Sequence, residues 1–209
     1  MAIYAKGPLG SFSGKLGNIV GSNWRSIDYL RSLPRPSKKA ATEKQLAQRS
    51  KFALTIDFLS PLRSFIDMGY NDSNQQKMTA FNQATKHLLP RIEGQYPDFI
   101  IPYDEVILSK GSLKGITTQA EINLDGDLQI SWDPSINPLS SEADDLVYII
   151  MYNETNKDYF LYQNATRGAG EDIINTEFMG QGELHIWATA MSSDGSKRSE
   201  SKYYGSVTL

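Results

Sequence analysis

Two hydrophobic periodicities follow one another along the chain. Between residues 42 and 89, apolar side chains recur every three or four positions, as they do along one face of a helix. From Phe99 onward they alternate with polar side chains, which is the period of a strand. The pattern therefore predicts an α+β protein in which helices precede an antiparallel sheet region.

The helical segment begins with two predicted helices. Thr42 and Gln45 form a capping-box pattern at the start of the first one. Ser60 and Pro61 end or kink this helix. The same two residues also fit the cap and first position of a short second helix, which Gly69 would end.

A third helix is predicted over residues 74–89. Ser73 and Gln76 supply its cap pattern. Pro90 stops it, because proline lacks the amide hydrogen that a helix interior requires.

The start of the chain is rich in glycine, which predicts a turn-rich β lead-in. Five glycines fall between residues 7 and 21 at intervals of three or four, but the spacing does not persist and is no repeat. Large side chains between Ile19 and Leu30 then favour a strand or a hairpin. The Leu-Pro-Arg-Pro run at residues 33–36 ends any regular element.

The alternating segment predicts about seven short strands, a number typical of a β-sandwich. Asp125 and Gly126 lie between two alternating runs, which is a strong signal for a β-hairpin. Further strands fit residues 146–152, 158–163, 172–176, 183–191 and 201–208. This spacing favours an antiparallel sandwich of immunoglobulin or fibronectin-III type, with Trp132 as a core anchor.

The change of period divides the chain into two expected parts. Residues 1–108 are expected to form a β-hairpin plus a helical docking region, and residues 109–209 the immunoglobulin-like sandwich. The two parts also differ in charge. Residues 1–60 carry ten basic and three acidic side chains, a net charge of +7, whereas residues 111–209 carry six and fifteen, a net charge of −9. Such a contrast favours association between charged surfaces.

Composition excludes several classes of protein. The sequence contains no cysteine, which excludes disulfides, thiolate metal sites and a cysteine nucleophile. Its start has no apolar run of about 7–15 residues, as a secretory signal peptide would. It also lacks the stretch of about 18 apolar residues that a membrane span needs. We expect a cytoplasmic location by default, or a protein that is released or carried in a virion.

No motif predicts catalysis. The Gly10–Lys15 segment resembles a phosphate-binding loop, but it has three residues between its glycines where four are needed, and Leu16 follows the lysine. His87 and His185 are the two histidines of the chain. We interpret His87 as a partner of a helix dipole and His185 as an exposed strand residue. We expect no enzyme activity, no cofactor and no metal.

Basic and aromatic side chains interleave in the N-terminal third. The side chains expected to dock a partner are Trp24, Arg25, Tyr29, Arg31 and Arg49. A solvated helix face with a basic connector is the plainer interpretation of the same residues. If they dock, the C-terminal half of a neighbouring copy is an acidic partner, and head-to-tail contacts of this kind produce rings or filaments.

Three runs near the start resemble a family of uncharacterised proteins that is common in Bacteroidota and has about this length. These runs are Gly7-x-Leu-Gly10-x-Phe-Ser-Gly14-Lys15-x-Gly17, Trp24-Arg25-x-Ile-Asp-Tyr29-x-Arg31 and Thr42-x-x-Gln45-x-x-x-Arg49-x-x-Phe52. The last run is also similar to the openings of some phage structural proteins. The first resemblance implies no catalytic residue, and the second implies an assembly subunit.

These observations favour a non-enzymatic structural or interaction protein, a subunit of a phage-like particle or surface structure that docks through its basic N-terminal part. A carbohydrate-binding module is one alternative, because aromatic residues are frequent in the predicted strands, although core packing is the expected role of most of them. These aromatics are Tyr148, Tyr152, Tyr159, Tyr162, Trp187, Tyr203 and Tyr204. Binding of nucleic acid or another polyanion through the basic third is the other alternative, although no nucleic-acid fold signature is present.

Overall fold

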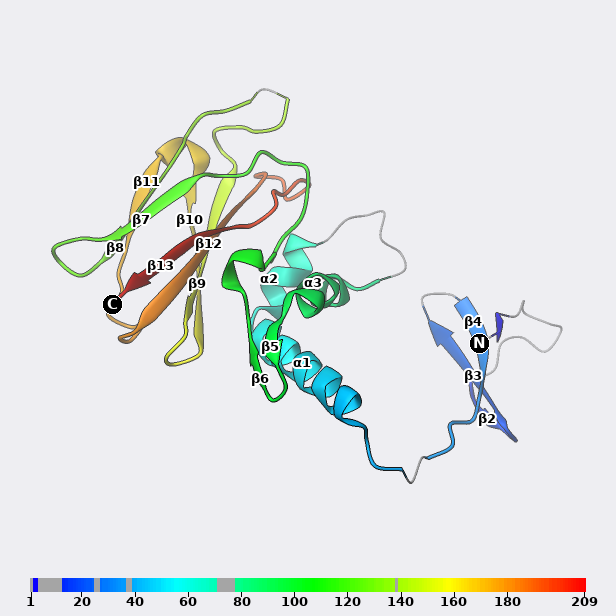
Figure 1. Ribbon diagram of the computed structural model, residues 1–209. Coiled ribbons are helices and arrows are strands. Elements are labelled where there is room, and N and C mark those ends of the chain that lie inside the picture. The colour runs from blue at the N-terminus through cyan, green and yellow to red at the C-terminus, as the bar shows by residue number, and fades with distance from the viewer. Residues whose placement is uncertain (1, 4–12, 25–26, 37–38, 71–77, 138) are drawn as a thin grey trace. The chain divides into compact units, whose positions relative to one another are not determined.

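The chain forms two compact units in a computed structural model that describes residues 2–3, 13–24, 27–36, 39–70, 78–137 and 139–209. One unit is Met1–Glu43 and the other is Lys44–Leu209. Antiparallel sheets and, among the described residues, three α-helices make this an α+β protein, as predicted (Figure 1). None of these helices is long and apolar enough to cross a membrane.

The N-terminal unit is a small antiparallel sheet with the strand order β1-β4-β3-β2. Its strands are β1 (Ala2–Ile3), β2 (Gly14–Leu16), β3 (Ile19–Trp24) and β4 (Ile27–Ser32). Leu16 and Ile19 are paired across a two-residue turn, and Gly17 in that turn has φ = 60°, which glycine adopts without strain. The described part of the glycine-rich lead-in is therefore a sheet.

The three helices belong to the second unit. They are α1 (Glu43–Leu59), α2 (Arg63–Gly69) and α3 (Ala80–Leu88). Helix α1 begins directly after Thr42, and α2 ends at Gly69, as expected. The expected cap of α2 was wrong, because Leu62 occupies that position without a side-chain hydrogen bond. Ser60 lies instead in the turn between the helices, where its carbonyl accepts a hydrogen bond from the Arg63 amide.

Helix α3 starts later than residue 74, where it was predicted to begin. Thr79 is its cap, and the Thr79 hydroxyl accepts a hydrogen bond from the Asn82 amide at 3.2 Å. The proposed Ser73–Gln76 cap lies outside the described residues. A threonine hydroxyl satisfies one of the free amides of a first helical turn, which explains a start at Ala80.

Two further sheets follow the helices. The strands of the first are β7 (Thr118–Ile122), β8 (Leu128–Trp132) and β11 (Glu171–Ile174), in the order β11-β8-β7. The strands of the second are β9 (Leu146–Asn153), β10 (Asp158–Thr166), β12 (Glu183–Met191) and β13 (Lys202–Thr208), in the order β10-β9-β12-β13. The remaining elements are the hairpin β5 (Glu93–Gln95) and β6 (Asp98–Ile100) and the 3-10 turns η1 (Leu89–Arg91), η2 (Tyr103–Glu105) and η3 (Arg167–Ala169).

The predicted hairpin at Asp125 and Gly126 is confirmed. It joins β7 to β8, and the side chain of Asn123 accepts hydrogen bonds from the amides of Asp125 and Asp127 at 2.9 Å each. Gly126 has φ = 88°, a conformation that favours glycine.

Two hydrophobic cores share strand β9 as their common wall. Val147, Ile149 and Met151 lie in the core between the two sheets, which also holds the buried Trp132. Tyr148 and Ile150 face the other way, into a core formed with the helices. A strand with both faces covered is apolar at successive positions.

The helices and the later strands therefore form one body. Phe58 of α1 and Phe65 of α2 lie in the same core as Trp187 of β12. The expected ranges 1–108 and 109–209 divide residues that share this core, whereas the compact division of the chain lies after Glu43. The division into residues 1–108 and 109–209 stays a prediction.

Candidate functional site

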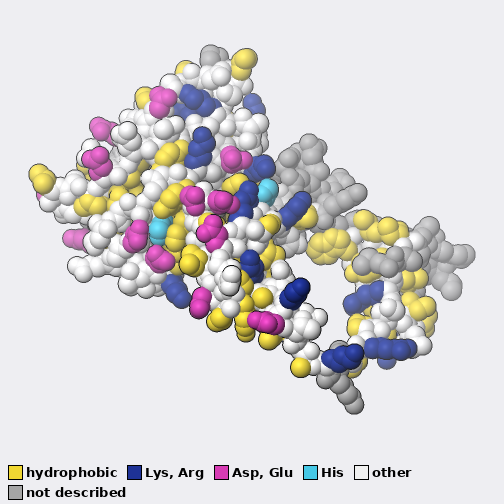
Figure 2. All heavy atoms as spheres, viewed as in Figure 1, with side chains coloured by type: hydrophobic (Ala, Val, Ile, Leu, Met, Phe, Trp, Pro, Cys, Tyr) yellow, Lys and Arg dark blue, Asp and Glu magenta, His cyan; other side chains and the backbone are white. Residues whose placement is uncertain are grey.

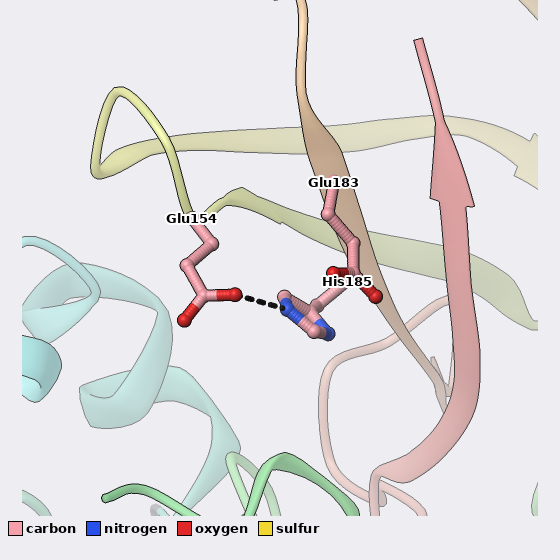
Figure 3. A group of neighbouring side chains, drawn as sticks. All are labelled: Glu154, Glu183 and His185. Carbon is pink, nitrogen blue, oxygen red and sulfur yellow. Dashed lines mark hydrogen bonds and ion pairs between the residues drawn. The ribbon is translucent and has the colours of Figure 1, made fainter.

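A buried histidine lies between two glutamates at one end of the β10-β9-β12-β13 sheet. Glu183 and His185 are two residues apart on β12, so their side chains project from the same face. Glu154 follows β9, and its amide donates a hydrogen bond to the Glu183 carbonyl at 3.1 Å. The two carboxylates point toward the imidazole from different sides (Figure 3). We call these three residues the His185 cluster.

Each member of the His185 cluster is held by a hydroxyl from a neighbouring residue. Nδ1 of His185 lies 2.8 Å from the Tyr203 hydroxyl, and Nε2 lies 3.4 Å from a carboxylate oxygen of Glu154. The other oxygen of Glu154 accepts a hydrogen bond from the Tyr103 hydroxyl at 3.2 Å. Ser206 donates to the Glu183 carboxylate. The orientation of all three side chains is thus fixed by contacts outside the cluster.

The expectation that His185 is exposed was wrong, because only 5% of its surface is accessible. Leu184 and Ile186 face the inter-sheet core, as the alternation indicated. The other face of β12, which carries His185, was expected to face solvent. The ring of Tyr103, from η2, covers it with its centroid 3.9 Å from that of the imidazole. A residue far away in the sequence therefore buries the histidine.

Burial has the largest effect on the pKa values of the two tyrosines at the site. Burial raises the pKa of Tyr103 well above its usual range, and nearby Tyr152 and Glu154 raise it further. Burial likewise raises the pKa of Tyr203. Both hydroxyls are therefore protonated and neutral near pH 7. Among the described residues, no lysine or arginine forms an ion pair with Glu154 or Glu183.

A hollow of 410 Å³ adjoins the His185 cluster and shares Glu154 with it. Tyr103, Tyr152 and Tyr159 form its aromatic wall, and Asp57 lies on its α1 side. The Tyr159 hydroxyl donates a hydrogen bond to the Phe58 carbonyl at 2.6 Å, which ties β10 to α1. The hollow therefore combines aromatic rings with carboxylates.

Three of the five expected docking residues lie on one face of the N-terminal sheet. Directly opposed residues of antiparallel strands share a face, and Tyr29 is opposite Ser22 while Trp24 is opposite Ile27. Arg31 lies two residues after Tyr29 and so projects from the same side. The described residues of this face, which we call the Trp24 face, are Ile3, Lys15, Val20, Ser22, Trp24, Ile27, Tyr29 and Arg31.

The other two expected docking residues do not join the Trp24 face. Arg25 lies outside the described residues. Arg49 is on α1 in the second unit, where it borders a shallow surface beside the half-exposed Phe52. The Trp24 face itself is open, since Ile3 is 75% exposed and Trp24 is 48% exposed.

The aromatic residues that suggested a sugar-binding surface are largely in the cores. Tyr148, Tyr152 and Trp187 are buried against the helices, and Tyr162 and Tyr204 pack against the inter-sheet core. Core packing, the role expected for most of them, is confirmed for these five.

The sequence analysis singled out neither Glu154 nor Glu183 as a candidate site residue. The Glu-x-His spacing on a strand was the available signal, because it places two possible ligands on one face.

His87 lies in the last turn of α3, as expected from the sequence. Partial burial lowers its pKa, and the charges of Lys110, Arg91 and Lys86 lower it further. A neutral imidazole contributes little at a helix C-terminus. The Arg91 side chain fills that role instead by donating a hydrogen bond to the His87 carbonyl at 2.6 Å.

Comparison with known proteins places the chain in a family. The sequence model of the family of unknown function DUF6266 matches residues 11–205, so the chain belongs to that family. The expected kinship with uncharacterised proteins is thereby confirmed. Neither a curated protein nor a solved structure matches the chain.

Proposed function

We propose that this member of the DUF6266 family is a non-enzymatic structural or interaction subunit that docks through its N-terminal sheet. One observation carries the proposal. Among the described residues of Met1–Glu43, no hydrophobic side chain is buried, whereas the second unit has two full cores. Asp28 and Gly21, on the face opposite the Trp24 face, are the buried positions described in this sheet, and a sheet with so little apolar burial has little to stabilise it.

The Trp24 face is the surface that gains most from being covered. Three of its apolar members, Ile3, Trp24 and Ile27, are exposed, and Val20 is partly exposed. Burying a large apolar side chain fully stabilises by about 1.5–3 kcal/mol, so covering several of them offsets the cost of association. Hydrophobic and basic side chains of this unit lie together at its surface (Figure 2).

A second copy of the chain is the partner that we propose. Lys15 and Arg31 make the Trp24 face basic, in a stretch with a net charge of +7. Residues 111–209 carry a net charge of −9. Opposite charges on the two ends favour a head-to-tail contact, and repetition of that contact builds a ring or a filament. A phage-like particle or a surface structure is an assembly of this type.

We further propose that the strands after residue 117 form the displayed module, a sandwich of the immunoglobulin/fibronectin-III class. The first, second and fifth of these strands, β7, β8 and β11, form one sheet. The third, sixth and seventh share the other, as in a constant-type immunoglobulin domain. The fourth strand, β10, pairs with β9 rather than with β11. This 3 + 4 arrangement and the core between the sheets support the proposal.

Oligomeric mass tests the docking proposal. Lys15→Glu combined with Arg31→Glu reverses the charge of the Trp24 face, and Arg35→Glu is the control beyond β4. We expect an assembly heavier than the 23.4 kDa chain for the wild type and the control, and a monomer for the double variant. Light scattering coupled to size exclusion measures this, with far-UV circular dichroism as the folding check. A monomeric wild type, or equal masses for all three, contradicts the proposal.

The hollow beside the His185 cluster favours carbohydrate binding as a second candidate function. Sugars bind where aromatic rings and polar side chains meet, and here Tyr103 and Tyr159 lie with Asp57 and Glu154. A glycan array followed by calorimetry tests this candidate. Tyr159→Ala should abolish binding, and an array without hits removes the candidate.

A further inference from the structure

We propose that Glu154, Glu183 and His185 bind a divalent transition-metal ion of the zinc type. Each side chain offers one ligand atom, and these atoms all lie within 4.8 Å of one another. Three protein ligands leave a further coordination position for water or for a side chain of a partner. The inference is independent of the docking proposal, because no member of the cluster belongs to the N-terminal unit.

The distances suit a small tetrahedral ion. Ligand bonds of about 2.0–2.1 Å place neighbouring ligand atoms about 3.3 Å apart. Nε2 of His185 and the nearer oxygen of Glu154 are already 3.4 Å apart. The third ligand atom, on the exposed Glu183, lies within 4.8 Å of the other two, so a small shift of the Glu183 carboxylate would complete the site.

The ligand types select the class of metal. An imidazole nitrogen with two carboxylates suits zinc, cobalt, nickel and copper, whereas calcium and magnesium take oxygen ligands almost exclusively. The two carboxylates have no lysine or arginine counter-ion among the described residues. A divalent ion would neutralise this charge directly.

The surrounding hydroxyls are arranged as an outer shell for such an ion. In the tautomer that metal binding requires, Nδ1–H would donate to the Tyr203 hydroxyl, and the lone pair of Nε2 would face Glu154. Tyr103 and Ser206 donate to Glu154 and Glu183 respectively. Outer-shell hydrogen bonds of this kind orient ligands, and their loss typically lowers metal affinity about 10–100-fold.

Titration of the full, untagged chain with zinc chloride tests the proposal by calorimetry. We expect one zinc ion per chain, and cobalt substitution should give the visible absorption of a tetrahedral site. Because the buried His185 is needed for packing, the decisive variants are Glu154→Gln and Glu183→Gln at exposed positions. Each should weaken zinc binding at least tenfold. Glu171→Gln, an exposed glutamate on β11, is the matched control and should bind as the wild type does.

Three results would overturn the site. The first is absence of zinc binding by the wild type at millimolar concentration. The second is unchanged affinity in both glutamine variants, which would place any bound zinc elsewhere. The third is displacement of zinc by equimolar calcium, which would indicate an all-oxygen site without His185. Circular dichroism of each variant confirms that lost binding does not reflect lost folding.

Discussion

The ring of Tyr103 covers the imidazole of His185, with the two centroids 3.9 Å apart and their planes inclined by 30°. The same tyrosine donates a hydrogen bond to Glu154, and its carbonyl accepts one from the Trp187 indole at 3.2 Å. The short turn η2 thus links the His185 cluster to the helix-side core.

Two substitutions at Tyr103 distinguish the contribution of its ring to stability from that of its hydroxyl. Tyr103→Phe keeps the ring, and the loss of one hydrogen bond should cost about 1 kcal/mol of the free energy of unfolding. Tyr103→Ala removes the cover of His185 and should cost about 2–3 kcal/mol. Urea denaturation measures both values. Equal losses for the two variants would mean that the ring contributes no packing.

Phe58 holds α1 against the sheet and should be the most sensitive position of that helix. It is 4% exposed, and its ring meets those of Tyr152, Tyr159 and Trp187 at centroid distances of 5.4, 5.7 and 6.4 Å. Phe58→Ala leaves a cavity and should cost about 3–5 kcal/mol.

The control for this prediction is on the same helix. Phe52 is 49% exposed, so Phe52→Ala should change the free energy of unfolding by only about 0.5 kcal/mol. Thermal and urea unfolding of both variants provide the comparison. A similar loss at both positions would contradict the packing of α1 described above.

The buried ion pair between Asp145 and Arg167 should be costly to break. Its atoms are 3.0 Å apart, and the two side chains are 2% and 0% exposed. Asp145→Asn leaves a buried guanidinium without its counter-charge and should cost about 3–5 kcal/mol. The exposed pair of Lys114 and Asp133 is the control, because Asp133→Asn should cost at most about 1 kcal/mol. Denaturant titration of both variants tests the difference.

Asp194 should titrate at unusually low pH. Its carboxylate accepts hydrogen bonds from the Ser192 hydroxyl and from the amide and hydroxyl of Ser196, which together lower its pKa to about 2. A lowered pKa in the folded state stabilises the protein above the usual aspartate value of about 3.9, and this stabilisation is lost as the pH falls toward 2.

Carboxyl NMR measures that titration directly. We expect a midpoint near 2 for Asp194 in the wild type. Ser192→Ala should move the midpoint up toward 3.9, because it removes the largest cause of the shift. A wild-type midpoint near the ordinary aspartate value would contradict the turn geometry.

Fragments test how the chain divides. Residues 44–209 contain every member of both cores, so this fragment should fold alone and unfold cooperatively. Residues 109–209 lack the helices that cover Tyr148 and Trp187, so that fragment should aggregate or unfold at a lower temperature. Circular dichroism melting distinguishes the two outcomes. A stable 109–209 fragment would contradict this expectation and support the boundary expected from the sequence.

Local patterns in the sequence predicted most elements of the second unit. The hairpin at Gly126 and the strands on either side of it follow from alternation and turn chemistry, which involve neighbouring residues only, whereas β9 follows from a continuous apolar run. The burial of His185 could not be predicted in this way. It depends on Tyr103, which is 82 residues earlier, and alternation says nothing about what covers a sheet face. The shared face of Trp24, Tyr29 and Arg31 depends likewise on the pairing register of β3 and β4.

Strand β9 has a consequence for how the protein tolerates mutation. Seven successive residues, Val147–Asn153, are buried, whereas along β10 exposed positions interrupt the covered ones. A scan of all single substitutions should therefore show an unbroken intolerant run on β9. Substitutions at the odd-numbered positions up to Met151 would disturb the packing between the two sheets. Substitutions at the even-numbered positions would disturb the packing of the helices against the sheet. Substitutions at alternate positions of β9 should therefore affect two different cores, and the two sets of positions should be constrained independently.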